Sequence, residues 1–118
     1  MFWEALEELL RWERQHLPGA DIRHATALLI WLQKANASPK SVSDLYSSSW
    51  FSEPTMRACL QAFVRAGLVV MESDPIDPRR RLARGTSRLE QTVEEYQDYL
   101  LKLARLIPRK KKRRSSRG

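Results

Sequence analysis

Apolar and polar residues recur along this chain with the periods of helices in most places and of a strand in one. Helical spacing of the apolar positions predicts amphipathic helices over residues 2–16 and 52–66. Residues 20–35 predict another helix. Because its centre, "ATALLIWLQKA", is nearly apolar on all sides, we expect it to be the buried spine of the domain. A shorter helix is predicted over residues 38–46.

Residues that suit helix ends mark the limits of these segments. Ser38 can cap the short helix, with Pro39 in its first turn. Ser52 is a typical N-cap for the helix that follows, and Gly67 is a typical glycine after its last turn. The residues expected to face the core from these helices and their flanks are Trp31, Val42, Leu45, Tyr46, Trp50, Met56, Leu60, Phe63 and Val64.

A strand and an arginine-rich turn follow. The apolar run "LVVME" (68–72) predicts a strand. The tight connection "SDPIDPRR" (73–80) contains two Asp-Pro pairs, and "RLARGT" (81–86) predicts a short return strand. We therefore expect a β-hairpin with a cationic tip.

A long helix is predicted from Ser87 until Pro108 ends it. Its apolar positions are four, three, four, three and four residues apart, a sustained a/d pattern. The following segment, "RKKKRRSSRG", has no apolar residue, so we expect residues 108–118 to be disordered. The apolar positions of the helix are Leu89, Val93, Tyr96, Leu100, Leu103 and Ile107.

The order of these elements predicts a mainly α fold with a small β-hairpin wing. It is a winged helix-turn-helix with dimerisation helices at both ends. The expected parts are an N-terminal helix (1–18), a winged helix-turn-helix region (19–86), a C-terminal helix (87–107) and a basic tail (108–118).

Composition limits the class of protein. A chain of 118 residues that is 42% hydrophobic forms one domain with one core. No apolar run approaches the roughly 20 residues of a membrane span, and the acidic N-terminal stretch is unlike a secretory signal or transit peptide. The single cysteine, Cys59, excludes a disulfide within the chain and a thiolate zinc site. We therefore expect a cytoplasmic protein.

The formal net charge of +7 is unevenly distributed. Seven of the 21 Lys and Arg residues lie in residues 108–118, and the remaining 14 balance the 14 Asp and Glu residues. Within that neutral body, residues 76–88 carry five arginines against one aspartate. Cationic charge focused on the hairpin and the tail is typical of a DNA-contacting protein.

At residues 51–86 the sequence, "FSEPTMRACLQAFVRAGLVVMESDPIDPRRRLARGT", resembles the second half of a MarR-type winged-helix regulator. In that family the recognition helix ends in a pattern like Leu-x-x-x-Gly-Leu-Val, which is "FVRAGLV" here. The family's wing carries Asp-x-Arg, and this chain has Asp77-Pro78-Arg79.

The helix after the wing opens, in that family, with a small cap and a basic residue, here Ser87-Arg88. Phe63 and Gly85 stand where the family usually has leucines. The resemblance extends over roughly residues 20–106. It implies a dimeric, cytoplasmic, nucleoid-associated transcriptional regulator that binds double-stranded DNA. Some family members release DNA on binding a small organic ligand, but no motif in this sequence predicts such an effector or any cofactor.

A recognition helix enters the major groove by its N-terminal end. Arg57 can pair with a guanine edge and Gln61 with adenine or a phosphate, while Thr55 and Ala58 can pack on a thymine methyl. The alternative for Arg57 and for Gln61 is a solvated side chain on the surface. Ser47, Ser48 and Ser49 in the preceding turn can donate to phosphates. The outward-facing residues predicted to contact DNA are Ser52, Pro54, Thr55, Arg57, Ala58 and Gln61.

The wing supplies a further predicted contact. Arg79, Arg80 and Arg81 can enter the adjacent minor groove or bind phosphates, and the alternative is a hairpin tip that is merely soluble. Asp77 is expected to cap the turn or to orient Arg79. The basic tail can add salt-dependent, non-specific affinity, serve as an import signal in a nucleated cell, or have no role.

The apolar stripes of the terminal helices indicate a homodimer, because together they are too rich for the surface of a small monomer. The alternative is that the first helix packs on the last within one chain. The residues assigned to the dimer interface are Phe2, Leu6, Leu9, Leu10, Leu100, Leu103 and Ile107, with Trp3 beside them.

The sequence contains no set of residues typical of an enzyme. His16 and His24 suit surface or capping roles better than metal binding, and Cys59 suits the core better than redox sensing. The main alternative to a regulator is a winged-helix module that binds protein. A replication or partition factor of a mobile element is another. The wing arginines beside Arg57 favour DNA, since a protein-binding wing has no special need of them.

Overall fold

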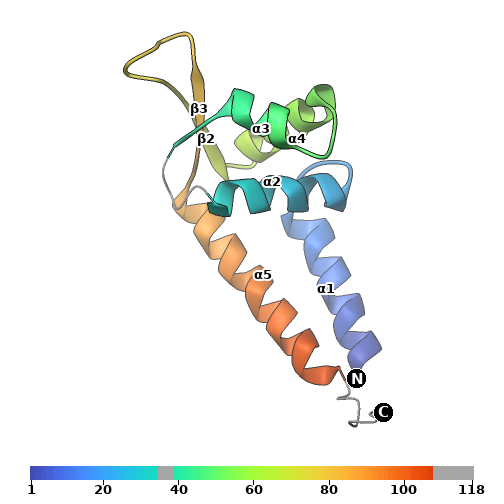
Figure 1. The fold of residues 1–118 in the computed structure, drawn as a ribbon. Coiled ribbons are helices and arrows are strands. Elements are labelled where there is room, and N and C mark those ends of the chain that lie inside the picture. Colours follow the sequence, from blue (N-terminus) through green and yellow to red (C-terminus); the bar gives the residue numbers. More distant parts are fainter. Residues whose placement is uncertain (35–38, 108–118) are drawn as a thin grey trace, which may run out of the picture.

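Helices and a small antiparallel sheet make up residues 1–34 and 39–107, which are the parts of the chain that the computed structural model describes (Figure 1). The expectations for Ser38 and for the tail at 108–118 lie outside these residues. The elements are α1 (Phe2–His16), α2 (Ile22–Lys34), β1 (Lys40–Ser41), α3 (Val42–Ser48), α4 (Glu53–Arg65), β2 (Val69–Ser73), β3 (Arg81–Gly85) and α5 (Ser87–Leu106).

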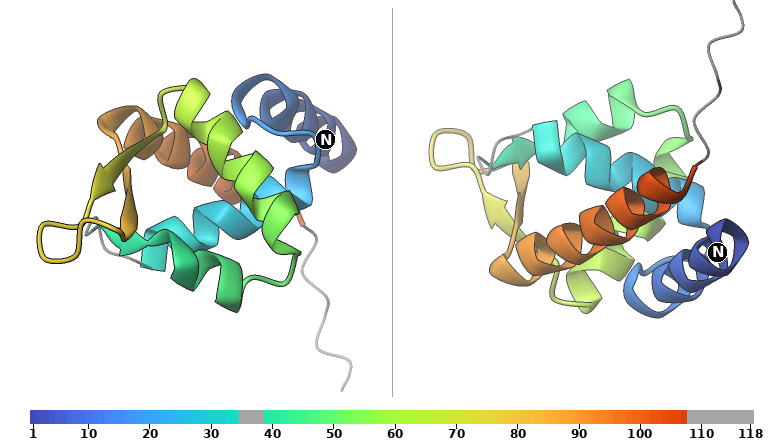
Figure 2. Two further views of the ribbon diagram at one scale, coloured as in Figure 1. Left: turned by 90° about the horizontal axis from the view of Figure 1, so that it is seen from above. Right: turned by 90° about the horizontal axis from the view of Figure 1, so that it is seen from below.

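Helix α2 crosses the middle of the molecule and separates its two ends (Figure 1). On one side lie α3, α4 and the β2–β3 hairpin, whose tip projects beyond the helices (Figure 2, left). On the other side α1 and α5 extend away as an antiparallel pair. The mainly helical fold with a β-hairpin wing is therefore confirmed.

The sheet has the strand order β1-β3-β2, with both pairs antiparallel. The hairpin was predicted, but β1 was not: residues 38–46 were expected to be one helix. Lys40 and Ser41 instead pair with Ala83 and Leu82, and α3 begins only at Val42. A two-residue strand leaves no periodicity in the sequence, because it is defined by its partner strand.

The core lies where α2, α3, α4 and the sheet meet. Leu28, Met56 and Phe63 are completely buried, and Trp31 is buried beside them. These positions confirm α2 as the spine and α4 as a helix with one inner face. Helix α2 starts two residues later than predicted, because the Asp21 carboxylate accepts a hydrogen bond from the Arg23 N–H (2.9 Å) ahead of the first turn.

Two predicted core residues are on the surface. Trp50 is 95% exposed, since it lies in the turn between α3 and α4, where the neighbouring Phe51 is the residue that packs against the core. Val64 is 37% exposed, because α4 buries Leu60 and Phe63 while the following position rotates to the edge of the contact.

Hydrogen bonds fasten the wing to the helix before it. Gly67 has a φ of +79°, which allows the chain to leave α4 and begin β2 at once. The Thr86 hydroxyl donates to the Gly67 carbonyl (2.7 Å), and the Thr86 N–H donates to the Leu68 carbonyl (3.0 Å). Thr86, rather than Ser87, is also the N-cap of α5, since its hydroxyl accepts from the Leu89 N–H (3.3 Å).

Helices α1 and α5 pack on each other within the chain. The Trp12 ring stacks on Tyr96 at 5.3 Å between centroids, and its indole N–H donates to Glu95 (3.1 Å). The Tyr96 hydroxyl donates to the buried carboxylate of Glu13 (2.7 Å), and burial together with Glu13 raises the pKa of Tyr96 to about 12. The first and last helices therefore pack on each other within one chain, which is the arrangement that the sequence left open as the alternative to a dimer contact.

The fold makes one prediction about stability. Replacing the completely buried Phe63 by Ala removes a ring and leaves a cavity, so we expect the free energy of unfolding to fall by about 3–5 kcal/mol in a urea titration. The adjacent Val64→Ala is the matched control and is expected to cost no more than about 1 kcal/mol, because its side chain is already partly in water. Equal losses for the two variants would contradict this placement of α4.

Candidate nucleic-acid interface

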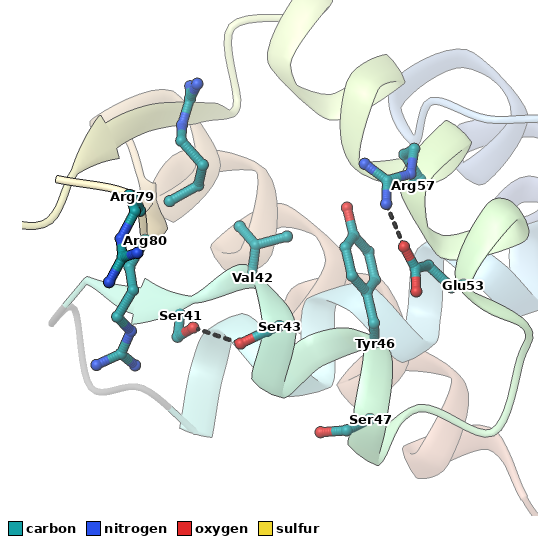
Figure 3. A pocket seen from close by; sticks show the side chains of 10 residues that line it. Ser41, Val42, Ser43, Tyr46, Ser47, Glu53, Arg57, Arg79 and Arg80 are labelled. Atoms are coloured by element: carbon teal, nitrogen blue, oxygen red, sulfur yellow. Dashed lines mark hydrogen bonds and ion pairs between the residues drawn. The ribbon is translucent and has the colours of Figure 1, made fainter. Parts of the chain in front are cut away.

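A concave surface lies between α3, the first half of α4 and the wing. It encloses about 530 Å³, and a neighbouring hollow of about 400 Å³ continues it along α4. Tyr46 comes from α3, Glu53 and Arg57 from α4, and the residues at 79–81 from the wing and the start of β3 (Figure 3). We call this surface the α4–wing groove.

The side chains around the α4–wing groove are predominantly cationic. The arginines that line the groove and its continuation are Arg57, Arg65, Arg79, Arg80 and Arg81. Among the described residues that line it, Glu53 supplies the carboxylate. A hollow with this excess of positive charge attracts a polyanion.

Arg57 is held in place within the α4–wing groove. Its guanidinium forms an ion pair with Glu53 one helical turn earlier and lies 4.9 Å from the centre of the Tyr46 ring (Figure 3). Burial raises the pKa of the Tyr46 hydroxyl, so the ring is a neutral platform for the cation. The guanidinium is about half exposed, so a ligand in the groove can reach it.

The predicted contacts of α4 divide into three groups. Arg57 and Gln61 line the hollows that face the wing. Pro54 and Ala58 are exposed elsewhere on the first turns. Ser52 and Thr55 are engaged with each other: the Ser52 hydroxyl donates to that of Thr55 (3.0 Å) and accepts the Thr55 N–H (3.4 Å) as the N-cap.

The wing turn holds its arginines with aspartates. The Asp77 carboxylate accepts from the Arg79 N–H (3.2 Å) and lies 3.5 Å from the Arg79 side chain, as predicted for a residue that caps the turn and orients Arg79. Asp74 lies 3.7 Å from the Arg80 guanidinium. Arg81 is the first residue of β3, and it lines both parts of the groove.

Ser47, Ser48 and Ser49 close the end of α3 rather than standing free. The Ser47 and Ser48 hydroxyls both donate to the Asp44 carbonyl, at 3.3 and 2.6 Å. The Ser49 hydroxyl accepts from the Phe51 N–H (3.0 Å). Each hydroxyl oxygen keeps lone pairs, but the donor hydrogens of the first two are already used.

Sequence reasoning missed Tyr46, Glu53 and Arg65 as members of this surface. Glu53 stands four residues before Arg57, which is the spacing of an ion pair along a helix, so it could have been found. The place of Tyr46 depends on how α3 packs across α4, for which the sequence carries no signal. Tyr46 was expected to face inward, and it is partly buried against the core.

The residues proposed for the dimer interface differ in exposure. Leu9 is buried inside the chain, so it is not part of the free surface. Leu10 is 55% exposed, Leu100 43% and Ile107 54%, and Trp3 at the end of α1 is 74% exposed. Phe2, Leu6 and Leu103 are partly buried. An apolar surface thus remains on α1 and α5 after they have packed on each other.

Other candidate sites are accounted for by local contacts. The His16 imidazole lies 2.9 Å from the Trp12 carbonyl, and His24 packs edge-on against Phe51 near Asp21. Across residues 1–34 and 39–107, no His, Cys, Asp and Glu side chains gather in a way that could hold a metal ion. Within the same residues, no helix is both long enough and apolar enough to cross a membrane.

Comparison with solved structures identifies the fold. The matches include a protein classed as a MarR-like transcription regulator from Bacillus cereus ATCC 10987 (TM-score 0.59, 20% identity, 92% of this chain and 77% of that one). A transcriptional regulator from Pseudomonas aeruginosa has a TM-score of 0.62 at 17% identity, covering 86% of this chain and 75% of its own. The heme sensor protein PefR, in complex with heme and carbon monoxide, has a TM-score of 0.68 at 18% identity, covering 92% of this chain and 75% of its own.

The chain matches no protein-family model and no curated protein sequence. The structural matches nevertheless share their fold with this chain, and they confirm the fold that the resemblance at residues 51–86 implies, a winged helix-turn-helix.

Burial of Cys59 makes a prediction about its chemistry. Desolvation raises the pKa of this thiol to about 11 from 9.0, so at pH 8 its thiolate fraction falls about 100-fold. We expect Cys59 to react with iodoacetamide at least that much more slowly in the folded protein than in urea, with the rates followed by mass spectrometry. Rapid reaction of the folded protein would instead mark an accessible, redox-sensitive thiol.

Proposed function

We propose that the chain is a transcriptional regulator that binds double-stranded DNA in a sequence-specific manner as a homodimer. The observation that carries this proposal is the α4–wing groove, in which arginines from α4 and from the wing gather on one concave face. Helix α4 enters the major groove and the wing enters the adjacent minor groove. We place the protein in the cytoplasm, on the nucleoid. A small-molecule effector is compatible with this function, although no motif in the sequence predicts one or a cofactor.

Arg57 and Gln61 carry the base recognition in this arrangement. Arg57 donates two hydrogen bonds to the edge of a guanine, and Gln61 pairs with an adenine. Tyr46 keeps the guanidinium over its ring in the free protein, so little side-chain freedom is lost when Arg57 binds. We infer that Glu53 releases Arg57 on DNA and that its carboxylate then accepts from a cytosine amino group.

The remaining predicted contacts of α4 position the helix. Thr55 and Ala58 pack on thymine methyl groups, and the exposed Ser52 and Pro54 lie against the backbone at the start of the helix. Arg79, Arg80 and Arg81 neutralise phosphates or enter the minor groove. The arginines of α4 and the wing thus contact adjacent grooves of the duplex.

The homodimer is supported by the apolar surface that α1 and α5 leave exposed. Leu10, Leu100 and Ile107 are each about half exposed, although both helices already bury a face against each other. A two-fold axis through this surface places two α4 helices about one turn of DNA apart, which suits a palindromic operator.

A salt series on DNA tests the central part of this function. Binding to a pool-selected duplex and to random genomic fragments is measured for the full chain and for a chain ending at Ile107. We expect the shortened chain to keep its preference for the selected duplex, because the α4–wing groove reads the bases. We expect Arg57→Ala to reduce that preference by roughly tenfold or more, since a bidentate base contact is lost.

Arg11→Ala is the matched control, because Arg11 is an exposed arginine of α1. Helix α1 extends away on the opposite side of α2 from the wing (Figure 1). Arg11→Ala is expected to leave the preference unchanged. If all binding disappears with residues 108–118, the folded part of the chain is not a reader of DNA. If Arg57→Ala keeps full selectivity, Arg57 does not carry the base recognition.

A second experiment tests the dimer. Leu100→Glu places a charge on the exposed apolar surface of α5, so we expect it to shift the protein from dimer to monomer in sedimentation velocity at micromolar concentration. Ile30→Glu is the control, because Ile30 is a comparably exposed aliphatic residue on α2. A wild-type chain that sediments as a monomer would contradict the dimer.

A further inference from the structure

The tip of the wing presents an apolar side chain to solvent. Ile76 is 93% exposed and belongs to the β2–β3 connection. This connection projects beyond the helices (Figure 1). Its neighbours along the turn are Asp and Pro residues followed by arginines. An aliphatic residue so fully exposed gains nothing from the fold of its own chain.

The turn that carries Ile76 is tightly constrained. The Ile76 N–H donates to the Asp74 carboxylate (2.8 Å), and the Arg80 N–H donates to the Asp77 carbonyl (2.9 Å). The Asp74 N–H donates to the Arg80 carbonyl (3.1 Å), which closes the base of the loop. Pro75 and Pro78 each fix one φ angle on either side of Ile76. The side chain is therefore held outward with little backbone freedom left to lose on binding.

The charges around Ile76 favour a nucleic acid as the partner. The two aspartates that could repel phosphates are engaged within the turn, Asp74 with Arg80 and Asp77 with Arg79. The Arg79 side chain, three residues after Ile76, is itself 93% exposed. A small apolar projection followed by arginines on the same tip matches a DNA minor groove, whose walls are phosphates and whose floor is the edges of stacked bases.

We propose that Ile76 is a wedge that enters a base step in the minor groove and kinks the duplex, so that the protein bends the DNA it binds. This inference rests on the proposed function, since it requires the wing to lie in the minor groove. The arginines on the same tip hold the flanking phosphates while the isoleucine separates the bases. Bending is easiest at pyrimidine–purine steps, so a TA or CA step beneath the wing contributes to site selection without any hydrogen bond to a base.

The test measures the bend directly. A duplex carrying the pool-selected site and a dye at each end is saturated with the full chain, and the end-to-end distance is followed by energy transfer. We expect the wild-type protein to shorten that distance by a kink within the range of about 20–90° known for apolar wedges. We expect Ile76→Ala to leave the DNA nearly straight at saturation, with the salt dependence of binding unchanged because no charge has been removed.

One further variant separates phosphate binding from DNA bending within the wing, and a second serves as a control on α2. Arg79→Ala is expected to weaken binding and lower the salt slope by about one, while the saturated complex stays bent. Ile30→Ala removes an exposed aliphatic residue from α2 and is expected to change neither the binding nor the bend.

A change in the DNA tests the site preference. Replacing the TA or CA step under the wing by AA is expected to weaken binding of the wild-type protein roughly tenfold and to have little effect on binding of Ile76→Ala.

The outcomes distinguish this inference from the function on which it rests. If the wild-type protein binds the selected duplex and leaves it straight, or if Ile76→Ala bends it equally, Ile76 is not a wedge. The proposed function as a DNA-binding regulator is unaffected by either result. If the full chain binds no duplex at all, the proposed function and the wedge both fail.

Discussion

The burial of one face of α4 is the constraint on which the rest of the structure depends. Met56 and Phe63 are completely buried against the core, so the helix has a single orientation and presents Arg57 and Gln61 on its other side. The wing takes its position from the same helix, since Gly67 turns the chain directly into β2 and Thr86 bonds the end of the hairpin to the start. The arginines of α4 and of the wing are thus placed on one groove by packing at some distance from them.

The two ends of the molecule differ in the chemistry of their surfaces: one is cationic and the other is apolar. Arginines gather around the α4–wing groove, while α1 and α5 keep exposed leucines and a tryptophan after packing on each other through Trp12 and Tyr96. Helix α2, the buried spine, lies between them (Figure 1).

Features that depend on local periodicity and on capping residues could be predicted from the sequence. Features that depend on tertiary contacts could not. The limits of α1 and the N-cap at Ser52 follow from patterns within a few residues, and both were predicted correctly. Trp50 was assigned to the core by its hydrophobicity, but in a turn the direction of a side chain depends on the backbone, and Phe51 packs inward instead. Strand β1 pairs with residues far along the chain, and Tyr46 meets Arg57 only through the packing of α3 against α4, so no local pattern predicts either contact.

The central claim is that DNA lies on the α4–wing groove, and amide chemical shifts measure this most directly. A labelled chain is titrated with a selected duplex at physiological salt. Our account predicts the largest shifts in the first half of α4 and in the β2–β3 turn, with small shifts along α1. Shifts confined to residues 108–118, with α4 and the wing unaffected, would contradict it.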